Sequence, residues 1–322
     1  MRNKPILSII IPCFNGENYL KNLFDNLCTQ ELTDCELIFI DDGSYDNTKE
    51  IISSWISTKE NAFLYSQKNM GVSWARNLGI SKSSGEYVAF LDCDDYYTVD
   101  GIKKIKQELQ FEDDVFVFGY LKDWGKKTKK LSQSYYDGVY SSEEFLSLFF
   151  SRKIKFWIGS FIVRRELLVS NAIEFNTHYR IGEDFDFYYR TIIVSNKNRY
   201  KSDIIFGYHI HMNSTTSNYS NYNLDMFNSF IINSKNAEEY FIQTNKLKEE
   251  SVYFRKYSYF IQFLLYLKSK KIRDYKIESL FEIYSKTLHL SGGLRINIIH
   301  SLAFFILRFV PLKFFFGVFK AK

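Results

Sequence analysis

The chain has 322 residues, of which 46% are hydrophobic and 25% charged, and this composition excludes a disordered chain and fits a globular protein. Its 42 basic and 37 acidic residues leave a net charge of +5, which is small for this length. The four cysteines show neither the C-x-x-C pairing of a zinc site nor the dense spacing of a secreted disulfide framework, and the N-terminus has no apolar stretch of signal-peptide length. We therefore expect reduced cysteines and a protein that faces the cytoplasm.

Strand-like and helix-like segments alternate in the first part of the chain. Apolar runs predict strands at 7–11, which should end at Pro12, and at 36–40, 62–65, 86–91 and 115–118. Apolar residues at helical spacing predict helices over 18–30, 72–82 and 99–109, and another that begins at Asp46 or Asn47. This alternation predicts an α/β fold, with a mostly parallel sheet and helices on both of its faces.

The region from 122 to 220 has a less regular pattern. The charged stretch 122–130 is expected to be a solvated loop, and Ser141–Glu144 has the pattern of a capping box that opens a helix. The apolar stretch 157–163 indicates a strand. At 182–187 a helix should begin with acidic residues in its first turn, as the helix dipole favours.

The most informative feature is a group of acids, Asp92, Asp94 and Asp95, which follows the strand at 86–91. Like charges at this spacing repel one another, so a divalent cation is a natural reason to gather them. Mg²⁺ and Mn²⁺ usually bind one or two carboxylates together with the phosphates of a substrate. The group therefore predicts a nucleotide held through its diphosphate, and the alternative is an ordinary turn, where Asp is common.

Other polar clusters follow strands at 13–16 and 41–44, and ligands of parallel sheets bind beyond the carboxyl ends of the strands. A carboxylate at 41–44 can accept a hydrogen bond from a uracil N3–H or a ribose hydroxyl. Arg76 lies either near the phosphates of a nucleotide or in solvent. Glu183 and Asp184 are either helix-capping acids or, opposite a metal-bound nucleotide, groups that can deprotonate an acceptor hydroxyl.

Five segments resemble, in their order and spacing, the motifs of the family 2 glycosyltransferases with the GT-A fold: 9–15, 41–44, 71–77, 92–95 and 182–184. The resemblance covers roughly residues 5–215 and implies a GT-A type, Rossmann-like sheet flanked by helices. It implies an inverting enzyme that transfers a sugar from a nucleotide sugar, often a UDP-sugar, with Mn²⁺ or Mg²⁺. We expect a catalytic domain at 1–220 and a helical extension at 221–322.

The resemblance also implies a role for each matching residue. The nucleotide would be bound by Pro12, Asn15, Asp41, Asp42, Arg76 and Asp92. Asp42 would contact the base and Asp92 the ribose, while Asp94 would bind the metal, with Asp92 as a second candidate ligand. Asp184 would be the catalytic base and Glu183 its neighbour in the motif.

The polar segment 209–218 occupies the place where the family often has a stretch that closes over the donor. It contains His209 and His211 where many relatives carry arginine. We expect the two histidines to lie on opposite faces of a strand, so that they cannot both be ligands. His211 is the one we assign to the diphosphate.

The C-terminal segment 294–322 is rich in Phe, but Arg308, Pro311 and Lys313 interrupt its apolar run. A spanning helix needs about 20 predominantly apolar residues, so we expect this segment either to lie in a membrane interface or to pack on the catalytic domain. Interfacial binding would place the enzyme at the inner face of the cell membrane. Basic residues mixed with Phe favour lipid over nucleic acid.

The function indicated is transfer of a hexosyl or N-acetylhexosaminyl group to a glycan or lipid-linked acceptor in surface polysaccharide or glycolipid assembly. A sugar nucleotidylyltransferase would need a glycine-rich, basic loop after the first strand, and 14–18 lacks one. A noncatalytic, membrane-associated assembly partner would not need the intact carboxylates. The sugar, the acceptor and the presence of a homo-oligomer stay open.

Overall fold

The computed structural model describes residues 4–211, apart from 126–127, 132–134, 151–152 and 180–181. The chain divides into two compact units, Met1–Thr244 and Asn245–Lys322, and every described residue belongs to the first. The expected extension at 221–322 and the segment after His211 lie outside the described residues, so the domain boundary at 220 stays a prediction. No helix in the described part of the chain is both long and apolar enough to cross a bilayer.

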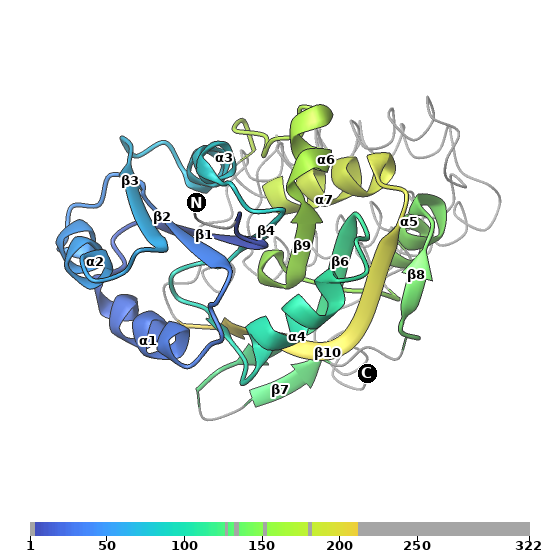
Figure 1. The fold of residues 1–322 in the computed structure, drawn as a ribbon, viewed down its shortest axis with the longest axis horizontal. Helices are drawn as coiled ribbons and strands as arrows, with labels where there is room; N and C mark the ends of the chain where they lie inside the picture. The colour runs from blue at the N-terminus through green and yellow to red at the C-terminus, as the bar shows by residue number, and fades with distance from the viewer. Residues whose placement is uncertain (1–3, 126–127, 132–134, 151–152, 180–181, 212–322) are drawn as a thin grey trace, which may run out of the picture. The chain divides into compact units, whose positions relative to one another are not determined.

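The first part of the chain contains the predicted strands and helices. They are β1 (Leu7–Cys13), α1 (Glu17–Cys28), β2 (Cys35–Asp41), α2 (Thr48–Ile56), β3 (Ala62–Ser66), α3 (Val72–Lys82), β4 (Tyr87–Phe90), β5 (Tyr96–Tyr97), α4 (Gly101–Leu109) and β6 (Val115–Asp123) (Figure 1). The short strand β5 was not expected.

The sequence predicted that the first strand ends at Pro12. Pro12 instead lies inside β1, opposite Ile40 of β2. The carbonyl oxygens of Ile6 and Ile10 accept hydrogen bonds from backbone N–H groups at either end of β4. Backbone groups of a strand alternate in direction, so the backbone nitrogen of Pro12 also points toward β4. Pairing between β1 and β4 ends at Ile10 and Phe90. The missing N–H of Pro12 therefore costs no ladder hydrogen bond.

The second part contains β7 (Thr128–Leu131), β8 (Gly138–Tyr140), α5 (Ser142–Phe150), the 3₁₀ turn η1 (Ile158–Ser160), β9 (Phe161–Arg164), α6 (Arg165–Ser170), α7 (Glu183–Val194) and β10 (Asn198–His209). The predicted capping box is confirmed, because Ser141 N–H donates to Glu144 Oε2 (3.0 Å) and Glu144 N–H donates to Ser141 Oγ (3.3 Å).

Two expectations for this part are wrong. The stretch 122–130 is not a loop throughout, because β6 continues to Asp123 and β7 pairs with it antiparallel after a turn in which Gly125 has a φ of 73°. Ladder hydrogen bonds come from the backbone, so charged side chains do not prevent such a ribbon. The stretch 157–163 is not one strand, because η1 precedes β9.

The strands form one ten-stranded sheet in the order β3-β2-β1-β4-β9-β6-β10-β5, with β7 on β6 and β8 on β10 (Figure 1). β1 to β4 are parallel, as are β6 and β10, and β9 is antiparallel to both β4 and β6. The larger parallel strands therefore point the same way. We call the edge of the sheet where these strands end the carboxyl edge. The predicted α/β fold with a mostly parallel sheet is confirmed.

Both faces of the central strands are buried, as a parallel sheet requires. Every residue of β1, β2 and β4 is buried. Apolar residues of α1, α2 and α4 share one core cluster with Leu7 and Ile9 of β1. On the other face α3 lies so close to β1 that a Cβ on Gly79 would be 2.2 Å from Ile10 Cγ2. This contact fixes the height of α3, which carries Arg76, above the sheet.

Candidate active site at the carboxyl edge

The candidate site is organised around Arg76, whose side chain is buried at the carboxyl edge. Arg76 Nη2 donates to both carboxylate oxygens of Asp92 (2.9 and 3.2 Å), and Nη1 donates to Glu183 Oε1 (3.3 Å). Burial opposes the charge of Arg76, but Asp92 and Glu183 raise its pKa above the ordinary value. The cation thus joins α3, the turn after β4 and the start of α7. Its buried Nε–H has no hydrogen-bond partner among the described residues.

Glu183 and Asp184 begin α7 directly after Gly182, which has a left-handed φ of 81°. Burial, followed by the charge of Asp184, raises the pKa of Glu183 to about 7, although Arg76 acts in the opposite direction. Asp184 Oδ1 accepts a hydrogen bond from the N–H of Phe185 (2.7 Å). The two acids are therefore placed at this edge by the helix start, as the sequence predicted for a helix at 182–187.

The acids after β4 crowd together, as expected from the sequence. Burial and the nearby Asp92 raise the pKa of Asp94, while a hydrogen bond with His211 lowers it. Asp94 Oδ2 and His211 Nε2 are 2.8 Å apart. Burial and the charges of Asp94 and Asp92 raise the pKa of Asp95, whose Oδ1 accepts from the N–H of His209 (2.8 Å). Asp95 thus anchors the end of β10 to the acidic turn.

The expectation that His209 and His211 lie on opposite faces is wrong. Their ring centroids are only 5.5 Å apart. Side chains of an extended chain alternate with a period of two, so residues i and i+2 share a face. His211 makes the side-chain contact with Asp94, whereas His209 meets Asp95 through its backbone.

Asp42 is buried and has contacts that tie β2 to the start of α3. Its carboxylate accepts hydrogen bonds from Gln67 Nε2 (2.7 Å), Met70 N–H (2.9 Å) and Gly71 N–H (2.8 Å). A carboxylate has about four acceptor sites, so little capacity is left for a ligand. Asp41, also buried, accepts from the N–H of Ser44 (3.1 Å).

Asn15 joins the loops that follow β1 and β2. Its N–H donates to Ser44 Oγ (3.0 Å), and its Oδ1 accepts from the N–H of Tyr45 (2.9 Å). Phe14 and Tyr45 are exposed and make an edge-to-face contact at 6.1 Å. The structure thus adds two aromatic rings beside the predicted nucleotide residue Asn15, and Pro12 is buried in β1.

Several residues at this edge were not predicted. Tyr19 Oη lies 3.2 Å from His211 Nδ1, but the sequence showed Tyr19 only as an apolar position of a helix. The ring of Trp157, next to the amino end of β9, stacks on Tyr208 at 4.9 Å. The buried hydroxyl of Tyr188 has no hydrogen-bond partner in the described part of the chain. The sequence indicated Tyr188 as a site residue only by its spacing of four from Asp184, which places the two side chains on one face of the helix.

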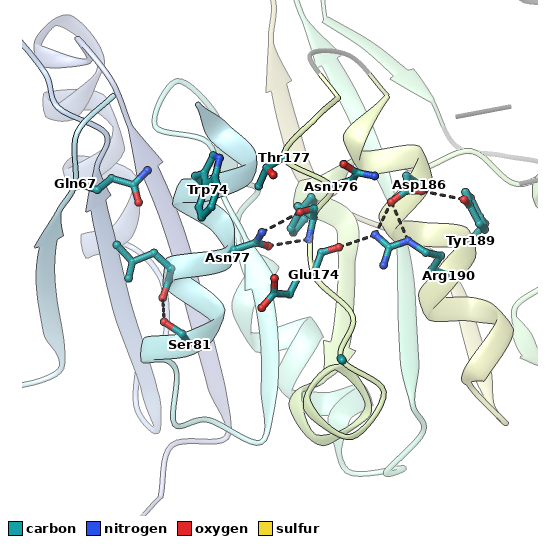
Figure 2. A pocket seen from close by; sticks show the side chains of 13 residues that line it. Gln67, Trp74, Asn77, Ser81, Glu174, Asn176, Thr177, Asp186, Tyr189 and Arg190 are labelled. Atoms are coloured by element: carbon teal, nitrogen blue, oxygen red, sulfur yellow. Dashed lines mark hydrogen bonds and ion pairs between the residues drawn. The ribbon is translucent and has the colours of Figure 1, made fainter. Parts of the chain in front are cut away.

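A groove of about 700 Å³ lies between α3, the segment 172–177 and α7 (Figure 2). Asn77 and Arg190 line it, but Asn77 bonds to both backbone groups of Phe175, and Arg190 bonds to Asp186 and to the carbonyl of Glu174. None of the predicted site residues lines this groove. The carboxyl edge, rather than the groove, is the candidate active site.

Within the described residues, no group of three or more His, Cys, Asp or Glu side chains is arranged to hold a metal ion. Asp94 and His211 nevertheless form a suitable pair. Two neighbouring ligands of an octahedral ion with bonds of about 2.1 Å lie about 3.0 Å apart. The 2.8 Å between Asp94 Oδ2 and His211 Nε2 is close to that spacing. The pair fits a cation that takes its other ligands from phosphates and water.

Comparison with known proteins agrees with this arrangement. The family described as "Glycosyl transferase family 2" matches residues 8–169, half of the chain. This chain belongs to glycosyltransferase family 2. The crystal structure of residues 1–349 of Staphylococcus aureus TarS in complex with UDP-GlcNAc shares the fold of this family 2 glycosyltransferase, with a TM-score of 0.60 and 21% identity over 71% of this chain and 65% of that one.

Curated relatives of this family 2 glycosyltransferase include the putative glycosyltransferase EpsH of Bacillus subtilis, which is 24% identical over 76% of this chain and 72% of its own length. The uncharacterized glycosyltransferase YibD of Escherichia coli is 31% identical over 65% of this chain and 63% of its own. The putative teichuronic acid biosynthesis glycosyltransferase TuaG of Bacillus subtilis is 33% identical over 34% of this chain and 42% of its own. The chain therefore matches less than two thirds of YibD and TuaG.

The raised pKa of Glu183 makes the stability of the enzyme depend on pH. The folded state holds a proton that the unfolded chain releases between pH 4.5 and about 7, so the free energy of unfolding falls as the pH rises through this range. Glu183→Gln cannot titrate. Urea unfolding at a series of pH values should therefore show the wild type losing stability relative to Glu183→Gln across that window.

The matched control is Glu166→Gln, at an exposed carboxylate of α6. Its stability difference from the wild type should not show this slope. A difference between wild type and Glu183→Gln that is independent of pH would contradict the raised pKa of Glu183.

Proposed function

We propose that this enzyme is a metal-dependent inverting glycosyltransferase that transfers a hexosyl or N-acetylhexosaminyl group from a UDP-sugar to a hydroxyl of a glycan or lipid-linked acceptor. The observation that carries the proposal is the buried Arg76, which holds Asp92 and Glu183 at the carboxyl edge, where ligands of such sheets bind. The similarity of the fold to TarS, solved with UDP-GlcNAc, supports a UDP-sugar as donor.

The proposed context is surface polysaccharide or glycolipid assembly. TuaG supports it, as do the chondroitin synthase and the hyaluronan synthase of Pasteurella multocida, each 34% identical over 32% of this chain and 11% of its own length. The names of these three relatives refer to polysaccharides, which supports a glycan acceptor more directly than a lipid-linked one.

In the proposed complex the nucleotide lies over the ends of β1 and β2. Pro12 and Asn15 line the pocket beside Phe14, whose exposed ring can stack on a base. Asp41, which accepts a hydrogen bond from Ser44, has acceptor capacity left for uracil or a ribose hydroxyl, and Asp42 has room for about one more hydrogen bond. Asp92 can accept one more hydrogen bond on each oxygen, which suits a ribose hydroxyl.

Asp94 and His211 would hold Mn²⁺ or Mg²⁺, with Asp92 close enough to contribute charge. When bound, the cation neutralises the negative charge that develops on the diphosphate leaving group. Burial and the repulsion among the acids after β4 raise the pKa of Asp94 and Asp95, and a cation would relieve both effects.

Asp184 is proposed to accept the proton of the acceptor hydroxyl as its oxygen attacks the anomeric carbon. The bond from that carbon to the diphosphate oxygen breaks, and its electron pair leaves with UDP. A single displacement inverts the anomeric carbon and needs no covalent enzyme intermediate. Glu183 is proposed to act by binding Arg76, which holds the helix start that carries Asp184.

Asp184→Asn keeps the size of the side chain but removes the base, so turnover should fall by about 10²–10⁴-fold while donor binding is retained. UDP release from a panel of UDP-sugars, assayed with Mn²⁺, Mg²⁺ or EDTA, measures this. The control, Asp203→Asn, changes an exposed carboxylate that pairs with Lys104. Full activity of Asp184→Asn would contradict the assignment of Asp184 as the base. Turnover that EDTA does not affect would contradict the proposed metal dependence.

We further propose that residues 1–220 form the catalytic domain and that the helical extension 221–322 contacts the inner face of the cell membrane from about residue 294. Phe314→Ser combined with Phe315→Ser should then reduce flotation of the full chain with anionic liposomes, because apolar area leaves the interface. The control is Phe111→Ser, at an exposed phenylalanine of the described unit. Equal flotation of all variants would contradict the proposed contact of the C-terminal segment with the membrane.

A further inference from the structure

Tyr19 connects the first helix of the fold to the proposed metal pair. Its hydroxyl lies 3.2 Å from His211 Nδ1, and the rings of Tyr19 and His211 are 4.8 Å apart with an interplanar angle of 31°. On the other side of the imidazole, His211 Nε2 lies 2.8 Å from Asp94 Oδ2. Tyr19 therefore holds His211 both by a polar contact and by its ring.

The charges around His211 select one tautomer in the absence of a cation. An ionised Asp94 only accepts hydrogen bonds, so Nε2 of a neutral His211 carries the proton. Nδ1 is then an acceptor, and it takes the hydroxyl proton of Tyr19.

Cation binding requires the other tautomer. A metal takes the lone pair of Nε2, so the ring proton must move to Nδ1. Nδ1–H then donates to the oxygen of Tyr19. A tyrosine hydroxyl both donates and accepts, so it can serve both states without movement of the helix. A phenylalanine at this position would serve neither.

We propose that Tyr19 is a positioning residue that fixes the orientation of the His211 ring and hydrogen-bonds its Nδ1 in either tautomer, and thereby sets the affinity of the site for the divalent cation bound with UDP. This inference rests on the proposed function. A residue that hydrogen-bonds the remote nitrogen of a ligating histidine typically changes metal affinity by about 10–100-fold. The Tyr19→Phe variant removes only the oxygen atom and keeps the ring contact.

Two measurements test the proposal. The first is titration of the full chain with Mn²⁺ in the presence of saturating UDP, with free Mn²⁺ followed by electron paramagnetic resonance. Tyr19→Phe should raise the Kd for Mn²⁺ by about 10–100-fold, with UDP binding in EDTA unchanged. The matched control is Tyr200→Phe, which removes a buried hydroxyl with no hydrogen-bond partner in the described structure.

The second measurement needs no metal. Long-range ¹H–¹⁵N spectra of ¹⁵N-histidine-labelled protein, with His211 assigned by comparison with His211→Ala, should show the proton on Nε2 in the wild type. Tyr19→Phe should keep this tautomer, because Asp94 selects it, but should shift the ¹⁵N resonance of Nδ1, which loses its hydrogen bond.

The outcomes separate the two claims. An unchanged Nδ1 resonance or an unchanged Kd in Tyr19→Phe overturns the role of Tyr19 alone, since the proposal requires both to change. Absence of Mn²⁺ binding by the wild type overturns the metal dependence of the proposed function and, with it, the role of Tyr19. Loss of affinity together with a shifted Nδ1 resonance, in a variant that melts like Tyr200→Phe, supports the proposal.

Discussion

The arrangement of the active site depends on one buried cation, Arg76, held between Asp92 and Glu183. Removing one partner from such a buried network typically costs about 3–5 kcal/mol, because an uncompensated charge remains. The intact network contributes much less to net stability, since burying its charges has its own desolvation cost. Its main effect is therefore positional: α3, the turn after β4 and the start of α7 keep a fixed relation at the point where their acids are needed.

The sheet makes this convergence possible. Parallel strands all end at one edge, so the turns after β1, β2 and β4 and the end of β10 come together although they are far apart in the sequence. The antiparallel β9, placed between β4 and β6, brings the Trp157 side chain to the same edge at its amino end. Close packing of Gly79 on Ile10 then sets how near α3 approaches. Backbone topology and a few tight contacts place the polar groups before any ligand is present.

Much of the fold followed from the sequence because buried parallel strands are continuous apolar runs and the helices between them are amphipathic. The acids after β4 and at the start of α7 were also visible, since clustered carboxylates have few structural reasons to exist. Features that depend on backbone hydrogen bonding could not be predicted from the sequence. The β6–β7 ribbon forms despite its charged sequence, and Pro12 lies within β1 because the pairing with β4 ends before it. Contacts such as Tyr19 with His211 depend on the packing of segments 192 residues apart.

In the proposed reaction, an acceptor oxygen activated at Asp184 displaces UDP in line across the carboxyl edge. Hydrolysis of an α-linked UDP-sugar tests it without knowledge of the natural acceptor, because water can take the place of the hydroxyl. Rapid ¹H nuclear magnetic resonance of the released sugar, recorded before its anomers equilibrate, gives the configuration of the first product. Single displacement with inversion should release the β-anomer first; the α-anomer as first product would contradict this mechanism.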